Sequence, residues 1–231
     1  PPPRARLLQL LLVLEKLSVS GGFVGVLDTY YTSALQDGAS GIPMFGAYQF
    51  AMQLSFAALL ASELDRQELA RTLLTGCPLA PLKQRARANE SHMCDSSVLA
   101  AWAVVQLRLG ELEQADATAA VAVTAYRSCY LQSAGLVDSP PFTLPILVMF
   151  HAERGNDQAT DLFCTELLRG NPDMRMTSAS LAAVELCAVR RRQGRHQEAR
   201  ELLERARAGV RDVPATHWIA RRTAALAKEM A

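Results

Sequence analysis

Apolar residues recur at intervals of three and four along most of this chain, which is the spacing of one face of an α-helix. Leu99, Trp102, Ala103 and Leu107 follow this rule in one stretch. Four stretches of helical length carry the pattern: residues 49–63, 96–109, 142–154 and 178–193. The pattern therefore predicts an all-α fold.

A turn residue and a second apolar stretch follow each of these segments. The turn residues are Asp65, Gly110, Gly155 and Gly194, separated by 45, 45 and 39 positions. Glycine or aspartate in this place favours a positive-φ or capping conformation that ends the first helix. An alanine follows five positions after three of the turn residues and four after Gly155, at Ala70, Ala115, Ala159 and Ala199. A small residue there would let two helix axes approach closely, so the unit is predicted to be helix, tight turn, helix.

Start and stop signals divide the chain in the same way. Ser96 and Ser178 are candidate N-caps, and Pro43 and Pro141 lie near predicted helix starts. The segments TGCPLAPLK, SAGLVDSPP and RGNPDM are rich in turn-forming residues and are predicted to be links. We expect one helical-repeat domain over residues 1–231, with antiparallel pairs at about 4–37, 43–75, 96–132, 140–169 and 178–210 and a final, capping helix at 214–230.

Composition agrees with helices and indicates a reducing compartment. Hydrophobic residues make up 50% of the chain and aromatic residues only 6%, so the apolar content is mostly alanine and leucine, which favour helices. The five cysteines are widely spaced without a CxxC pair, which argues against a disulfide framework or a zinc ribbon. We therefore expect an intracellular protein.

The first residues resemble a signal peptide only superficially. Leu7, Leu10, Leu11 and Leu14 keep helical spacing, and Gln9 interrupts the apolar run, so an ordinary first helix is expected. No apolar stretch approaches the roughly 20 residues that span a bilayer, and we expect no membrane span. The chain begins with proline. We expect that a segment preceded it, and an organellar transit peptide is one candidate.

Charge is distributed unevenly along the chain. The net charge is +1, but residues from 190 onward hold 11 basic and 5 acidic side chains, so that residues 1–189 have a net charge of −5. The candidate contacts for RNA or a partner protein are Arg190, Arg191, Arg192, Arg195, Arg200, Arg221 and Arg222. Arginine binds phosphate bidentately, but glutamates interleave with these residues. Two interpretations stay open: a surface of internal salt bridges, or a contact for RNA or an acidic protein.

Residues typical of catalytic or metal sites occur without the spacing that such sites need. His92, Cys94 and Asp95 match no closed zinc site, and a solvated loop is expected there. His151 and Glu153 lack the second histidine of a metalloprotease helix and are interpreted as a pair at a helix end.

Two further candidates have equally ordinary interpretations. The three glycines of SGGFVGV, residues 20–26, have no following Lys-Ser/Thr and no preceding strand, so a phosphate-binding loop is not expected. Cys129 is interpreted as a half-buried packing thiol. No catalytic residue, no cofactor, no metal and no small-molecule substrate is predicted.

A family resemblance rests on the last quarter of the chain. The Gly-x-x-x-Glu-Ala and Leu-Leu pattern of residues 194–203, repeated weakly upstream, resembles the hairpins of tetratricopeptide and pentatricopeptide repeat proteins. A pentatricopeptide linker, in which a glycine and a proline-aspartate lead into the next helix, is similar to the segment LLRGNPDMRMTSASLAAVEL. A comparable order of residues occurs near the front of the chain, in ALQDGASGIPMFGAYQFAMQL. The resemblance implies an α-solenoid of about five helix pairs that works by binding.

The leading hypothesis is a non-catalytic scaffold or adaptor subunit of a larger assembly. The resemblance, the proline start and the basic end favour an organellar ribonucleoprotein, such as the mitochondrial ribosome or an RNA-processing complex, with protein subunits and RNA as partners. The alternative is a tetratricopeptide-like module of a bacterial transcription regulator that senses a peptide or small ligand in its concave groove. A site assembled from distant helices in an enzyme is the third hypothesis.

Overall fold

The computed structural model is helical wherever it describes the chain. It describes residues 54–55, 57–59, 61–62, 65–77, 79–88, 93–132, 143–170, 177–211, 213, 215 and 218–230. These residues form helices and turns and include no strand, so the predicted all-α class is confirmed for them. The predicted pair at 4–37 and the glycines of residues 20–26 lie outside the described residues.

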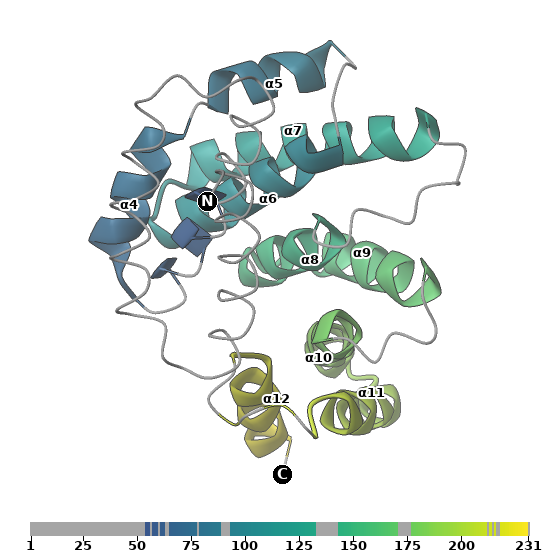
Figure 1. Cartoon of the computed structure of the whole chain (residues 1–231). Helices are drawn as coiled ribbons and strands as arrows, with labels where there is room; N and C mark the ends of the chain where they lie inside the picture. The colour runs from purple at the N-terminus through teal and green to yellow at the C-terminus, as the bar shows by residue number, and fades with distance from the viewer. Residues whose placement is uncertain are drawn as a thin grey trace, which may run out of the picture. The chain divides into compact units, whose positions relative to one another are not determined.

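The helices follow the predicted division closely (Figure 1). Helical residues from Leu54 to Ser62 precede the first turn. The later helices are α4 (Gln67–Gly76), α5 (Leu79–Arg87), α6 (Met93–Arg108), α7 (Leu112–Gln132), α8 (Thr143–Glu153), α9 (Asp157–Gly170), α10 (Thr177–Arg192), α11 (His196–Gly209) and α12 (Trp218–Glu229).

These helices belong to two compact units of the chain. Helices α4 to α9 lie in the unit made by residues 34–174, and α10 to α12 lie in the other unit. In the first unit α6 packs on α7 and α8, α8 packs on α9, and α5 packs on α7. In the second unit α10 packs on α11, and α12 packs on both.

The four predicted turn residues all have positive φ. The values are 58° for Asp65, 81° for Gly110, 71° for Gly155 and 75° for Gly194. In every turn the amide of the turn residue donates to the carbonyl of the residue three positions before it, at 3.0–3.2 Å. The amide of the following residue donates to the carbonyl five positions before itself, at 2.8–2.9 Å. This is the Schellman ending of a helix. The glycine and aspartate prediction is therefore confirmed, and one backbone geometry recurs four times.

A small residue is completely buried five positions after each turn residue. Ala70, Ala115 and Ala199 occupy this place as predicted. After Gly155 the prediction of Ala159 was wrong: the buried residue is Thr160, and Ala159 is only half-buried. Threonine is accepted because its Oγ1 donates to the Asn156 carbonyl at 2.8 Å, which satisfies the hydroxyl inside its own helix.

Two segments predicted to be loops are helical. The link TGCPLAPLK contains the start of α5, in which Pro81 is the third residue and needs no intrahelical amide bond. Helix α6 begins at Met93, so Ser96 lies inside it and is not its N-cap. The expectation of a solvated loop around Asp95 was also wrong, because this carboxylate is fully buried and accepts two hydrogen bonds from Arg85, at 3.0 and 3.2 Å.

The first helix of each pair is enclosed on every side. All side chains of residues 95–106 in α6, 143–150 in α8 and 180–187 in α10 are buried. In α7, α9 and α11 buried and exposed residues alternate with helical spacing. Buried hydroxyls join the starts of α6 and α8, where Ser96 and Ser97 lie 3.0 and 2.6 Å from the Thr143 hydroxyl. The exposed side chains of the paired helices are therefore carried mainly by the second helix of each pair.

Candidate functional site: the basic C-terminal helices

The seven arginines predicted as contacts lie on three helices and one turn of the C-terminal unit. Arg190, Arg191 and Arg192 end α10, Arg195 follows the Gly194 turn, Arg200 lies on α11, and Arg221 and Arg222 lie on α12. The sequence treated them as one cluster. The structure separates them by their partners within the protein.

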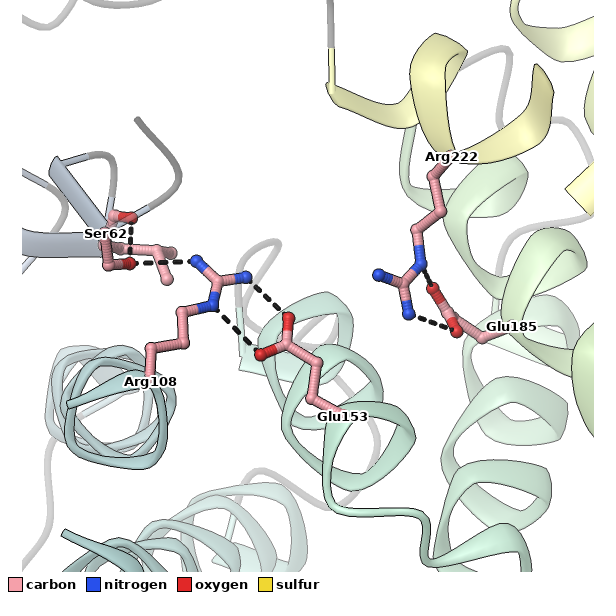
Figure 2. Close-up of polar contacts among 6 residues, drawn as sticks. Ser62, Arg108, Glu153, Glu185 and Arg222 are labelled. Carbon is pink, nitrogen blue, oxygen red and sulfur yellow. Dashed lines mark hydrogen bonds and ion pairs between the residues drawn. The ribbon is translucent and has the colours of Figure 1, made fainter. Parts of the chain in front are cut away.

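Two of these arginines are held by polar contacts within the unit. Arg222 forms a two-pronged ion pair with Glu185, a carboxylate only 3% exposed on α10, and its Nη2 lies 2.8 Å from Oε2 (Figure 2). Arg190 is 8% exposed and contacts Gln193 at 3.1 Å and Glu198 at 3.5 Å. Removing the Arg222 guanidinium would leave buried Glu185 without its main counter-charge. Removing Arg190 would take away a nearly buried side chain, while Glu198 would keep its pair with Arg195, so both arginines are primarily structural.

Two others form ion pairs at the surface. Arg191 contacts Glu229 at 2.6 Å, joining the end of α10 to the end of α12. Arg195 contacts both oxygens of Glu198 at 2.6 Å. Because surface pairs are worth only about 0–1 kcal/mol, these arginines can exchange a glutamate for another anion at small cost.

Arg200 and Arg221 are exposed, and neither makes a hydrogen bond or ion pair with the described part of the chain. Arg192 is exposed as well but has an interaction of its own. The predicted set omitted three exposed arginines of the same region, Arg205, Arg207 and Arg211. Their spacing from Arg200 is the signal that could have identified Arg207 and Arg211: intervals of seven and four place residues on one side of a helix.

A second polar cluster links three consecutive helix ends in the larger unit. Arg108 at the end of α6 donates to both oxygens of Glu153 at the end of α8, at 2.6 and 3.0 Å, and to Ser62 Oγ at 2.9 Å (Figure 2). Ser62 in turn donates to the Leu59 carbonyl at 2.5 Å. Arg108 and Glu153 both lie two residues before a turn glycine, so the pair joins equivalent positions of neighbouring helix pairs. The interpretation of Glu153 as a helix-end residue is confirmed.

His151 is also at this helix end, but its ring lies in an apolar setting. It stacks on Phe163 of α9 at 5.2 Å between ring centres, and neither nitrogen has a hydrogen-bond partner among the described residues. Burial lowers the pKa of His151, and the carboxylate of Asp116 on α7 opposes that effect. Asp116 is itself held by Arg154 at 2.8 and 2.9 Å, which lowers the pKa of Asp116.

Cys77 and Cys187 have the environment of packing residues. Burial raises the pKa of the Cys77 thiol to about 12, although the Trp102 indole donates a hydrogen bond to its sulfur at 3.0 Å. Burial likewise raises the pKa of Cys187. Cys129 is half-buried, as predicted. Thiols of raised pKa are poor nucleophiles and poor metal ligands at neutral pH.

The described residues hold no candidate metal site and no candidate membrane-spanning helix. No cluster of three or more histidine, cysteine, aspartate or glutamate side chains has the arrangement of a metal site. None of the described helices is both long enough and apolar enough to cross a bilayer. The exposed arginines of α11 and α12 are thus the strongest candidate contact surface in the described part of the chain.

Comparison with known proteins gave no relative: no protein-family model, no curated protein and no solved structure matches this chain.

Proposed function

We propose that this protein is a non-catalytic helical-repeat scaffold, an adaptor subunit of a larger assembly. The observation that carries the proposal is the fourfold recurrence of one turn geometry, at Asp65, Gly110, Gly155 and Gly194, with a completely buried small residue five positions later. Repeated helix pairs of this kind stack through their neighbours and leave long outer faces for binding. In the proposal the pairs are antiparallel and build an α-solenoid.

The distribution of burial supports docking on the second helices. Residues 95–106, 143–150 and 180–187 of the first helices have no exposed side chain, so these stretches offer no open inner face to a ligand. Helices α7, α9 and α11 present exposed polar side chains. A partner would therefore meet the second helices, α7 and α9 in one unit or α11 in the other. This weighs against a sensor module that binds a ligand in a groove lined by the first helices.

An organellar ribonucleoprotein, with the mitochondrion as compartment, is the assembly we propose. Two features support it: the similarity of residues 194–203 to the hairpins of tetratricopeptide and pentatricopeptide repeat proteins, and the excess of arginine from residue 190 onward. Arg200 and Arg211 add to this support because they are exposed and make no ion pair or hydrogen bond with the described residues. Their charge suits the phosphates of an RNA.

The test is the hydrodynamic size of the endogenous protein. Extracts of the native source would be fractionated on a gradient, untreated and after RNase treatment, and the protein followed with an antibody. The proposal expects it to sediment far above its chain mass of 25.1 kDa, together with ribonucleoprotein markers, and to shift after RNase treatment. Sedimentation as a free chain in both extracts would refute the scaffold function. A large complex that RNase leaves unchanged would support the scaffold function and refute the part of the proposal that includes RNA.

A further inference from the structure

One side of helix α11 carries a row of arginines. Arg200 and Arg207 are separated by seven residues, an interval that brings them to one side of a helix, and Arg211 follows four residues later in the turn beyond the helix. Arg211 lies two residues beyond the end of α11, where the Val210 amide still donates to the Ala206 carbonyl at 3.1 Å. All three are exposed, and Arg200 and Arg211 form no ion pair or hydrogen bond with the described residues. We call these three residues the arginine row.

One glutamate interrupts the arginine row. Glu204 lies between Arg200 and Arg207 on the same side and pairs with Arg207 at 2.6 Å. The side chain of Arg207 is 50% exposed and that of Glu204 is 68% exposed. Such an exposed pair contributes about 0–1 kcal/mol. Glu204 therefore competes only weakly with another anion for Arg207. The pair differs in this from Arg222 and Glu185, in which the carboxylate is buried.

The surroundings of the row favour a phosphate polymer over a protein partner. Protein interfaces depend on buried aromatic or aliphatic anchors. The exposed large hydrophobic side chains of the described residues are Leu112 and Leu162, which belong to the other unit. The row is polar throughout. Guanidinium groups bind phosphate oxygens bidentately without needing an apolar anchor.

We infer that the arginine row binds the phosphate backbone of RNA without reading its bases. This inference rests on the proposed function and specifies the surface that contacts RNA. Arg200 and Arg207 are seven residues apart, or about 10 Å along a helix, so they would contact different phosphates of one strand. Every phenylalanine, tyrosine and tryptophan side chain whose burial the structure describes is buried, so these residues offer bases no platform for stacking.

The test is a salt titration of RNA binding by the full chain. Fluorescence anisotropy with a labelled single-stranded uridine oligonucleotide gives the affinity at each salt concentration. Three phosphate contacts predict a slope of log affinity against log salt near −2, or roughly a 20-fold loss between about 50 and 200 mM salt. The double variant Arg200→Gln with Arg211→Gln should retain one contact, with a slope near −0.7 and roughly a threefold loss.

The matched control removes the same charge elsewhere. Arg205 lies on the opposite side of α11, and Arg221 lies on α12; both are exposed without ion pairs to described residues. Arg205→Gln with Arg221→Gln should keep the wild-type slope. A second pair of variants tests for a gain: Glu204→Gln should tighten RNA binding because it frees Arg207, whereas Glu201→Gln, on another side of α11, should not. Circular dichroism establishes that each variant is folded.

The outcomes separate this inference from the proposed function. Equal slopes for the two double variants would refute the arginine row, while RNA binding itself would still support a ribonucleoprotein subunit. Equal competition by polyglutamate would refute recognition of a phosphate backbone. A full chain that does not bind RNA would refute the row and remove RNA from the proposed assembly, leaving a protein scaffold to be judged by the gradient experiment.

Discussion

Replacing Ala159 with glutamate should give His151 the partner that its counterparts in other helix pairs have. His151 lies four residues before Gly155, and Ala159 lies four residues after it. At the same two places around Gly110, the Gln106 amide donates to Gln114 at 3.4 Å, and around Gly194, Arg190 contacts Glu198 at 3.5 Å. Alanine has no polar group to offer, which explains why the ring nitrogens of His151 lack a hydrogen-bond partner in the described structure.

The magnitude follows from what the new carboxylate adds. A hydrogen bond to the neutral ring is worth about 1 kcal/mol, and ordering the glutamate and replacing alanine in a helix cost about half of that. We therefore expect Ala159→Glu to raise the free energy of unfolding by about 0.5 kcal/mol at pH 8. Protonation of the ring makes the interaction about twice as strong, so the gain should grow as pH falls, towards about 1.5 kcal/mol once the ring is charged.

The pH dependence has a definite sign. Burial lowers the pKa of His151 in the folded protein, so the unfolded chain binds its proton more tightly. The stability contributed by neutral His151 is fully present above its unfolded pKa of about 6.5 and is lost progressively as pH falls from there through the lower folded pKa. The carboxylate introduced by Ala159→Glu would stabilise the protonated ring, raise the folded pKa of His151 and reduce this loss.

Urea unfolding at pH 5 and pH 8 measures the stability, and an NMR titration of the ring protons measures the pKa of His151. The matched control is Gln158→Glu, which adds the same charge to the first turn of α9 at an exposed position. It experiences the same helix dipole without facing His151. The reasoning is refuted if the two variants have the same unfolding free energies, or if the titration of His151 is unchanged in Ala159→Glu.

Three further predictions concern the turns, the buried ion pair and the thiols. Asp65→Gly should stabilise the protein by about 1 kcal/mol, because Asp65 has a φ of 58° that glycine adopts without cost. Gly194→Ala should destabilise it by about 1–2 kcal/mol, because Gly194 has a φ of 75°. Thermal melts in which both variants shift the midpoint in the same direction would contradict this. Arg222→Ala should lower the free energy of unfolding by about 1–3 kcal/mol, because it leaves buried Glu185 without the guanidinium that pairs with it. Arg195→Ala should lower it by less than about 1 kcal/mol, because that pair is exposed. Urea midpoints that fall equally in the two variants would show that burial does not distinguish the two pairs. Half-buried Cys129 should react with a thiol reagent before Cys77, whose pKa is raised to about 12; mass spectrometry of the labelled peptides gives the order, and early labelling of Cys77 would disprove its burial.

The helix pairs were predictable because their signals are local. Each pair is indicated by three signals within about 30 positions of the chain: an apolar stretch of helical length, a glycine or aspartate that takes a positive φ, and a small residue after it. The predicted pairs at 96–132, 140–169 and 178–210 accordingly begin and end within three residues of the helices found. The error at Ala159 had a local cause as well: alanine was taken as the only small residue, although threonine at position 160 can satisfy its hydroxyl inside its own helix.

Helix α5 and the position of Asp95 were missed for a different reason. Two prolines near Leu79 were interpreted as loop residues, but proline is acceptable in the first turn of a helix. Asp95 was assigned to a solvated loop because the spacing around it matches no metal site, yet Arg85, ten residues earlier, pairs with this buried carboxylate. A helix start can be recognised only weakly from sequence when its stabilising partner belongs to another helix.

The sequence by itself determined the class of the fold, the position of its turns and the excess of arginine at one end, because each of these depends on neighbouring residues or on composition alone. Only the tertiary structure decided which arginines are available. Arg221 and Arg222 are adjacent in the chain, but one is exposed and the other pairs with Glu185, 37 residues away. The free energy of an ion pair depends on burial and distance in space, and neither can be read from the order of residues.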